Sequence, residues 1–156
     1  MQNYIKSQTR LAFVQYIFQN EFLNTDSSEN INDFQKHFYD TNIAIIDEKK
    51  EFKLKFNKNF LNRLFYSFKN NIDKNIIIED LNQFIDINRK FEKWDNILKS
   101  IIFAIIAELL ITEKNKFKIV FNDYLNISKS LVSQKETKLI NAIIQKYIDK
   151  DEINKK

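Results

Sequence analysis

One stretch of the chain, residues 101–111, is apolar almost throughout. It reads IIFAIIAELLI, in which Glu108 is the exception. A surface helix keeps one side polar, so a run that is apolar nearly all round predicts a buried helix. A membrane-spanning helix needs about 20 apolar residues, and this run is shorter. The pattern therefore predicts a central buried helix in an all-α fold, with Asp95 as its candidate N-cap.

Apolar residues at helical spacing predict further helices on both sides of this run. Before it, the pattern predicts a first helix over 3–23, a short helix through Phe34, Phe38 and Tyr39, and a long helical pattern over 58–85 with a break near Asp73–Asn75. After it, the pattern predicts a polar turn at 114–116 and a helix over 117–131. A last helix follows, at which Ser133 and Glu136 form a capping box. Residues 41–57 include the alternating EFKLKF, but no partner strand is evident, so we expect an irregular connection or an early helix there. The chain is thus predicted to be a compact bundle of six to seven helices.

The composition excludes several kinds of site, because the 156 residues include no glycine, no proline and no cysteine. Without glycine there is neither a Gly-rich phosphate loop nor a dinucleotide-binding fingerprint. Without cysteine there is neither a disulfide nor a thiolate zinc site, which is compatible with a cytoplasmic protein. The start of the chain has no apolar segment typical of a signal peptide. We therefore expect no cofactor, no metal and no membrane association.

The acids and the single histidine give no sign of a catalytic site. Paired acids such as Glu79–Asp80 are adjacent in sequence and point in different directions on a helix. His37 is expected on the surface of the short helix. Glu108 is the informative acid, because an unpaired charge in a buried helix would be costly; we expect it to pair with a base or with an N-terminal amide of a neighbouring helix. The sequence therefore predicts a protein that is not an enzyme.

The formal net charge of +4 is unevenly spread. Residues 26–51 carry more acids than bases, and residues 52–74 carry more bases than acids. Basic patches are typical of nucleic-acid binding, but solvated lysine faces explain the same figures. On the first helix Lys6 and Arg10 lie beside each other, and Phe13 on the same side is expected to be partly exposed.

Four segments, in order, carry motifs at matching spacing: TRLAFVQYIF, IIFAIIAEL, FNDYLNISKSL and KLINAII. This succession resembles the NusB family of bacterial transcription antitermination factors. The matching positions are Arg10, Val14, Gln15, Ile17 and Phe18, then Ile102, Ala104, Glu108 and Leu109, then Phe121, Asn122, Asp123, Ser128, Lys129 and Leu131, and finally Leu139, Ile140, Asn141, Ile143 and Ile144.

The chain departs from the family pattern at four places. The basic start of the family is reduced here to Lys6 and Arg10. Phe103 replaces an arginine of the central helix, Ala142 replaces a glycine of the last motif, and Gln145 replaces an acid. The thin basic start bears on RNA affinity more than on fold, and alanine in place of glycine is favourable inside a helix.

The resemblance implies a single RNA-binding domain over residues 1–156, made of two helical sub-bundles at about 1–86 and 94–150, with 151–156 as a frayed tail. It also implies that the protein binds the single-stranded boxA element of nascent ribosomal RNA together with the ribosomal protein NusE, within the RNA polymerase antitermination complex. A homodimer that buries the RNA face is left open.

The RNA-binding candidates that follow from the resemblance are cations, which would contact phosphates, and aromatic rings, which would stack on unpaired bases. They are Lys6, Arg10, Phe13, Phe18, Lys135 and Lys138. For Phe18 the apolar stripe favours core packing over stacking. Two alternatives remain at this point: the RNA-binding domain of an RNA methyltransferase, and a helical protein-interaction module without an RNA role.

Overall fold

The computed structural model describes residues 2–22, 43–47, 50–53, 56–85 and 90–150. Three sequence predictions lie outside these residues. They are the short helix through Phe34, Phe38 and Tyr39, the surface position of His37, and the frayed tail 151–156.

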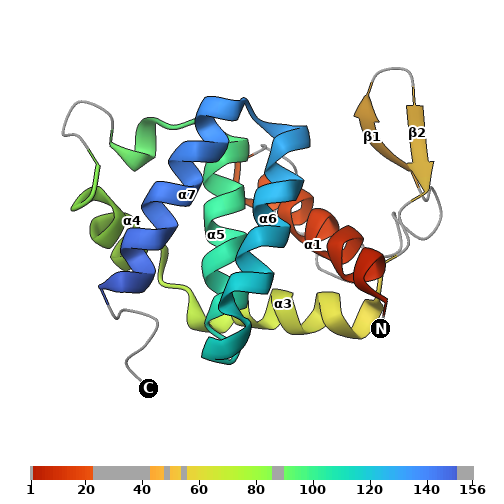
Figure 1. Ribbon diagram of the computed structural model, residues 1–156, viewed down its shortest axis with the longest axis horizontal. Coiled ribbons are helices and arrows are strands. Elements are labelled where there is room, and N and C mark those ends of the chain that lie inside the picture. Colours follow the sequence, from red (N-terminus) through yellow and green to blue (C-terminus); the bar gives the residue numbers. More distant parts are fainter. Residues whose placement is uncertain (1, 23–42, 48–49, 54–55, 86–89, 151–156) are drawn as a thin grey trace.

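Helices make up most of the described chain (Figure 1), which confirms the predicted all-α class. The α-helices are α1 (Asn3–Ile17), α3 (Lys58–Asn71), α4 (Lys74–Asn82), α5 (Asn96–Leu109), α6 (Phe117–Leu131) and α7 (Gln134–Asp149). A π-helix, η1 (Phe18–Phe22), continues α1, and short 3-10 turns, η3 (Phe91–Lys93) and η4 (Lys114–Lys116), precede α5 and α6. The division into two sub-bundles stays a prediction.

The described part of residues 41–57 forms a β-hairpin beside the helices (Figure 1). Strand β1 (Ile43–Asp47) pairs antiparallel with β2 (Lys50–Lys53), and the register shifts between Ile45 and Asp47. The expectation of an irregular connection or an early helix is therefore wrong for these strands. The strand that contains EFK pairs with the segment IAIID just before it. The isoleucines of IAIID are β-branched, and β-branched residues favour strands.

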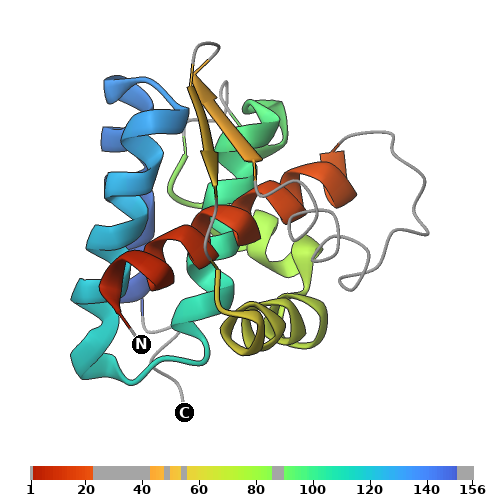
Figure 2. The ribbon, with the colours of Figure 1, turned by 90° about the vertical axis from the view of Figure 1, so that its right-hand side faces the viewer.

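Helix α5 is the centre of the fold, as the apolar run predicts. Every residue from Ile101 to Leu109 is buried, and α5 packs against α1, α3, α6 and α7. Figure 2 shows α1 crossing the molecule between α3 and α6. Asp95 occupies the N-cap position of α5, although its side chain makes no capping hydrogen bond. Among the described residues, no helix is long and apolar enough to cross a bilayer.

Aromatic side chains join α1, α3 and α5 in the core. Phe13 lies edge-on to Phe68 with 6.3 Å between ring centroids, and Phe68 lies 6.4 Å from Phe103. Phe103 in turn lies edge-on to Phe91 at 5.5 Å. Phe13 is 0% exposed, so the prediction of partial exposure is wrong: the ring points to the core because an aromatic partner on α3 faces it there.

Side-chain caps set the helix boundaries that the sequence indicates. The long pattern over 58–85 breaks where predicted, because Asp73 accepts hydrogen bonds from the backbone N–H groups of Asn75 and Ile76 and so starts α4. The capping box at α7 is also confirmed: Ser133 Oγ accepts from the backbone N–H of Glu136 at 3.1 Å, and the Glu136 carboxylate accepts from the Ser133 N–H at 3.1 Å.

Replacing Ser133 by alanine is expected to lower the free energy of unfolding by about 1 kcal/mol, because the N-terminal amides of α7 lose their acceptor. Urea unfolding followed by circular dichroism measures this change. Ser130→Ala is the matched control, since the Ser130 hydroxyl donates to the Ile127 carbonyl and caps no helix start. Equal losses in the two variants would contradict the assignment of the cap.

Candidate nucleic-acid interface

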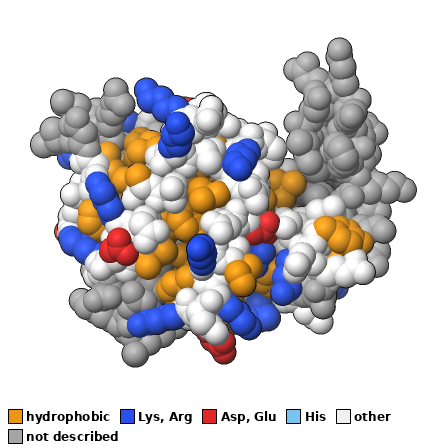
Figure 3. Space-filling model, viewed as in Figure 1, with side chains coloured by type: hydrophobic (Ala, Val, Ile, Leu, Met, Phe, Trp, Pro, Cys, Tyr) orange, Lys and Arg blue, Asp and Glu red, His pale blue; other side chains and the backbone are white. Residues whose placement is uncertain are grey.

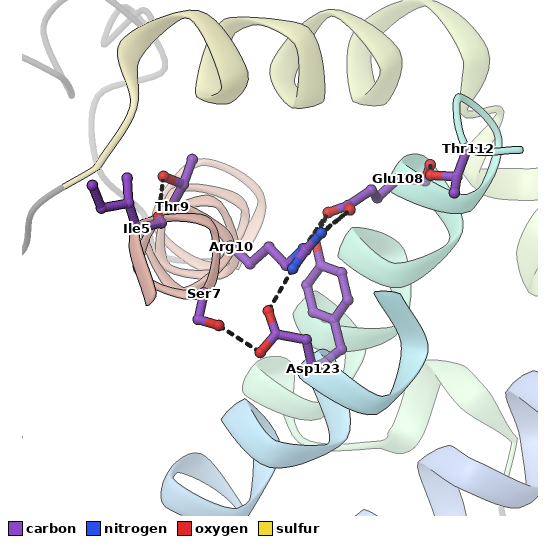
Figure 4. A network of polar contacts seen from close by, with 8 residues as sticks. Ile5, Ser7, Thr9, Arg10, Glu108, Thr112 and Asp123 are labelled. Atoms are coloured by element: carbon purple, nitrogen blue, oxygen red, sulfur yellow. Dashed lines mark hydrogen bonds and ion pairs between the residues drawn. The ribbon is translucent and has the colours of Figure 1, made fainter. Parts of the chain in front are cut away.

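Arg10 of α1 reaches inward to carboxylates on two other helices (Figure 4). Its Nε donates to Glu108 Oε1 and Oε2 at 2.9 and 3.0 Å, and its Nη2 donates to Oε2 at 2.7 Å. Its Nη1 donates to Asp123 Oδ2 at 2.6 Å. A single guanidinium therefore ties α1 to α5 through Glu108 and to α6 through Asp123.

Neighbouring side chains complete this group, which we call the Arg10 network: Ser7, Arg10, Glu108, Asp123 and Tyr124. Ser7 Oγ donates to Asp123 Oδ1 at 2.6 Å, and Tyr124 OH donates to Glu108 Oε1 at 2.8 Å. The Arg10 guanidinium also lies 5.8 Å from the centroid of the Tyr124 ring, a cation–π distance. Each carboxylate thus accepts hydrogen bonds from two residues, which offsets the cost of burying its charge.

The charges of the network change the pKa of two of its members. Burial by itself lowers the pKa of Arg10, but the hydrogen bonds and negative charge of Glu108, helped by Asp123, outweigh it and leave that pKa raised. Burial, reinforced by the charge of Glu108, raises the pKa of Tyr124 well above 10.0. Arg10 therefore stays charged and the Tyr124 hydroxyl stays protonated as a donor.

These contacts test two expectations about charged residues. Glu108 pairs with a base, as its position in a buried helix predicts. Arg10 is only 7% exposed and is committed to two carboxylates. The structure thus buries the Arg10 guanidinium, as it buries the Phe13 ring, because Glu108 and Asp123 attract the guanidinium inward.

A groove of about 770 Å³ lies on the solvent side of the Arg10 network. Its wall includes three cationic residues from three different elements: Lys6 of α1, Arg63 of α3 and Lys116 of η4. The polar residues around them include three amides and three acids, and two of the acids, Glu108 and Asp123, are paired with Arg10. The other lining residues are Asn3, Ser7, Arg10, Phe60, Glu108, Ile111, Thr112, Glu113, Ile119, Val120, Asn122, Asp123 and Asn126.

A second, shallower depression of about 400 Å³ continues this surface between α6 and α7. It shares Asn122 and Asn126 with the groove and adds Lys129 and Lys138. Lys135, which is exposed, lies one turn before Lys138. On the face that carries α6 and α7, lysine and arginine side chains are spread widely and acidic ones are fewer (Figure 3). The two depressions form one path with amides along it and cations at its rim.

A family model described as "NusB family" matches residues 7–149. The chain belongs to the NusB family. The transcription antitermination protein NusB of Rickettsia conorii is 28% identical over 145 residues, which cover 90% of this chain and 89% of that protein. The proteins of the same name from Rickettsia massiliae and Rickettsia rickettsii are 28% and 27% identical over the same shares. The search of solved structures gives no match.

In this NusB-family chain the structure separates the RNA-binding candidates into two groups. Lys6 and Lys138 line the path and Lys135 lies beside it, whereas Phe18 is half-buried at the start of the π-helix. The sequence interpretation missed the other residues of the path. Arg63 falls in the basic stretch 52–74, which could have pointed to it. Asn122, Asn126 and Lys129 stand at helical spacing in the predicted helix 117–131 and so share one face. Nothing in the sequence shows that this face lies beside Lys6 and Arg63.

Replacing Arg10 by methionine is expected to lower the free energy of unfolding by about 3–5 kcal/mol, because Glu108 is left buried without its cation. The double variant Arg10→Met/Glu108→Gln should lose less than the sum of the two single changes, since both members of the pair are then gone. Urea unfolding of all three variants measures this. The exposed Arg63→Met is the control and should stay within about 0.5 kcal/mol of the wild type; strict additivity of the pair would contradict the buried ion pair.

The raised pKa of Tyr124 predicts a pH dependence of stability. Between the unfolded pKa, near 10.0, and the higher folded pKa, the folded state holds a proton that the unfolded state has lost. The contribution of Tyr124 is therefore complete below about pH 10 and declines above it by about 1.4 kcal/mol per pH unit. The stability difference between wild type and Tyr124→Phe should shrink as the pH rises from 9 to 11. Tyr66→Phe, at an exposed tyrosine, should show no such change.

Proposed function

We propose that this NusB-family protein binds boxA-type single-stranded RNA of nascent ribosomal transcripts together with the ribosomal protein NusE, and acts in transcription antitermination in the cytoplasm. Family membership and relatives named transcription antitermination protein NusB support this proposal. The observation that carries it is the path along α6, with Lys6, Arg63 and Lys116 at one end and Lys129 and Lys138 at the other.

The chemistry of the path suits a flexible polyanion. Dispersed cations contact phosphates one at a time and release counterions. The amides of Asn122 and Asn126, midway along the path, carry both a donor and an acceptor and can therefore hydrogen-bond to the edges of unpaired bases. Lys135 extends the cationic rim on α7. RNA contact by Arg10 and Phe13 does not form part of the proposal, since both side chains are buried.

The partner is needed because the cations are sparse. Lys6 and Arg10 are the predicted phosphate contacts on α1 and both line the groove, but Arg10 is committed to two carboxylates. The family's basic start is otherwise reduced. In the proposal NusE supplies further contacts to the same RNA and to the polymerase complex. Stacking by Phe18, a homodimer and the RNA-methyltransferase alternative stay predictions.

The double variant Lys6→Gln/Lys138→Gln is expected to weaken RNA binding and to reduce its salt dependence. Each lost phosphate contact lowers the slope of log affinity against log salt by about 0.7 for a single strand, so two should lower it by about 1.4. Fluorescence anisotropy with labelled boxA-type RNA, with and without NusE, at several salt concentrations measures the slope.

Lys146→Gln is the matched control, because Lys146 is exposed on the same helix as Lys138 and lines neither depression. Absence of binding at low salt with NusE present would falsify the proposal. Affinity that ignores salt and resides wholly in the protein partner would instead favour a helical interaction module.

A further inference from the structure

The outer face of α3 combines cations with an exposed aromatic ring. Over its 14 residues, KNFLNRLFYSFKNN, the helix contains no acid, a property that it shares with α1. Its exposed positions carry cations, amides and one aromatic ring. They are Lys58, Asn59, Asn62, Arg63, Tyr66, Lys69, Asn70 and Asn71.

Tyr66 is the apolar side chain of this face. It is 67% exposed, whereas Leu64 and Phe68 on the inner side of α3 are buried. Phe65 lies edge-on to Tyr16 at 4.6 Å between centroids, and Phe68 packs against Phe13 and Phe103. These two rings, and not Tyr66, make the aromatic contacts of α3 with the core. A ring left in water beside cations has the chemistry of a base-stacking platform.

This face continues the groove. Arg63 lies one turn before Tyr66 on the same side of the helix and lines the groove itself. The start of α3 is also fixed beside α1, because the backbone N–H of Asn57 donates to Thr9 Oγ1 at 2.9 Å. A single-stranded RNA that contacts Lys6 and Arg63 in the groove can therefore continue directly onto Tyr66.

The charges near this face favour a polyanion. Lys69 follows Tyr66 by one turn, and its Nζ lies 5.0 Å over the Phe65 ring. The acids nearby are Asp73, which caps α4, and three acids that line the groove. Of these three, Glu108 and Asp123 are paired with Arg10, and the third is Glu113. A protein interface has an apolar core, but among the exposed large apolar side chains of the described residues Tyr66 alone belongs to α3.

We propose that the outer face of α3 is a further contact for the same single-stranded RNA, with Tyr66 stacking on a base and Arg63 and Lys69 holding phosphates on either side. This inference rests on the proposed function, since it extends the RNA path from the groove onto a second surface. It assigns an aromatic contact on α3 in place of the one predicted for the buried Phe13.

The salt dependence of RNA affinity distinguishes a stacking contact from a phosphate contact, because only the phosphate contact releases counterions. In anisotropy titrations of the full chain with single-stranded RNA of about 14 nucleotides, Tyr66→Ala should weaken binding about five-fold or more at every salt concentration, without changing the salt slope. Tyr66→Phe should bind like the wild type, because the ring is kept. Lys69→Gln should lower the slope by about 0.7. Ile76→Ala, at an exposed apolar residue of α4, is the control for surface truncation.

A second readout is direct: RNA carrying 4-thiouridine should photo-cross-link to a peptide that contains Tyr66. If Tyr66→Ala and Lys69→Gln bind like the wild type while Lys6→Gln/Lys138→Gln binds weakly, the α3 contact is overturned and the proposed function stands. If Tyr66→Ala impairs NusE binding but leaves RNA binding unchanged, α3 contacts protein and the RNA assignment is overturned. If the wild type binds no RNA even with NusE at low salt, both proposals are overturned.

Discussion

A guanidinium buried where three helices meet fixes the geometry of this protein. Taking Arg10 out of water is favourable only while its donors are occupied by Glu108 and Asp123, and a buried Glu108 needs the same cation in return. Because the two carboxylates belong to α5 and α6, α1 has little freedom to slide or rotate without breaking charge-assisted hydrogen bonds, which are the stronger kind. The fold is therefore held by a directional contact as well as by the apolar surface of α5.

The surface path depends on the same contact. Lys6 lies one turn before Arg10 on α1, so the pairing that draws Arg10 inward brings Lys6 to the wall of the groove. On α6, Asp123 is used by Arg10 while its neighbour Asn122 lines both depressions. One guanidinium meets two carboxylates in the network, whereas the cations Lys6, Arg63 and Lys116 lie along the wall of the groove. The buried network thus sets the position of the candidate interface, and these other residues supply its positive charge.

The features that sequence patterns predicted are local ones. The apolar run 101–111, the break before Asp73 and the capping box at Ser133 depend on residues within a turn or two of each other, so period and cap chemistry identify them. The need of Glu108 for a partner was also predictable, but the identity of that partner was not, since Arg10 lies 98 residues away. The spacing of Lys6 and Arg10 was typical of a basic surface, and only tertiary packing separates the outward residue from the inward one. Arg63, Lys116 and Asn122 come from three elements whose proximity no periodicity encodes.

The dispersal of the cations has a consequence for how such an interface works. A protein with a basic terminal segment can bind RNA through that flexible segment. In this chain the cations are instead distributed over folded elements, since α1, α3, η4, α6 and α7 contribute one or a few cations each. Contacts spread over rigid elements lose little conformational entropy when they bind, since their positions are set in advance. The same contacts exist together only while α1 is held against α5 and α6. In the proposed function, RNA affinity is therefore a property of the folded arrangement, which the Arg10 network holds in place.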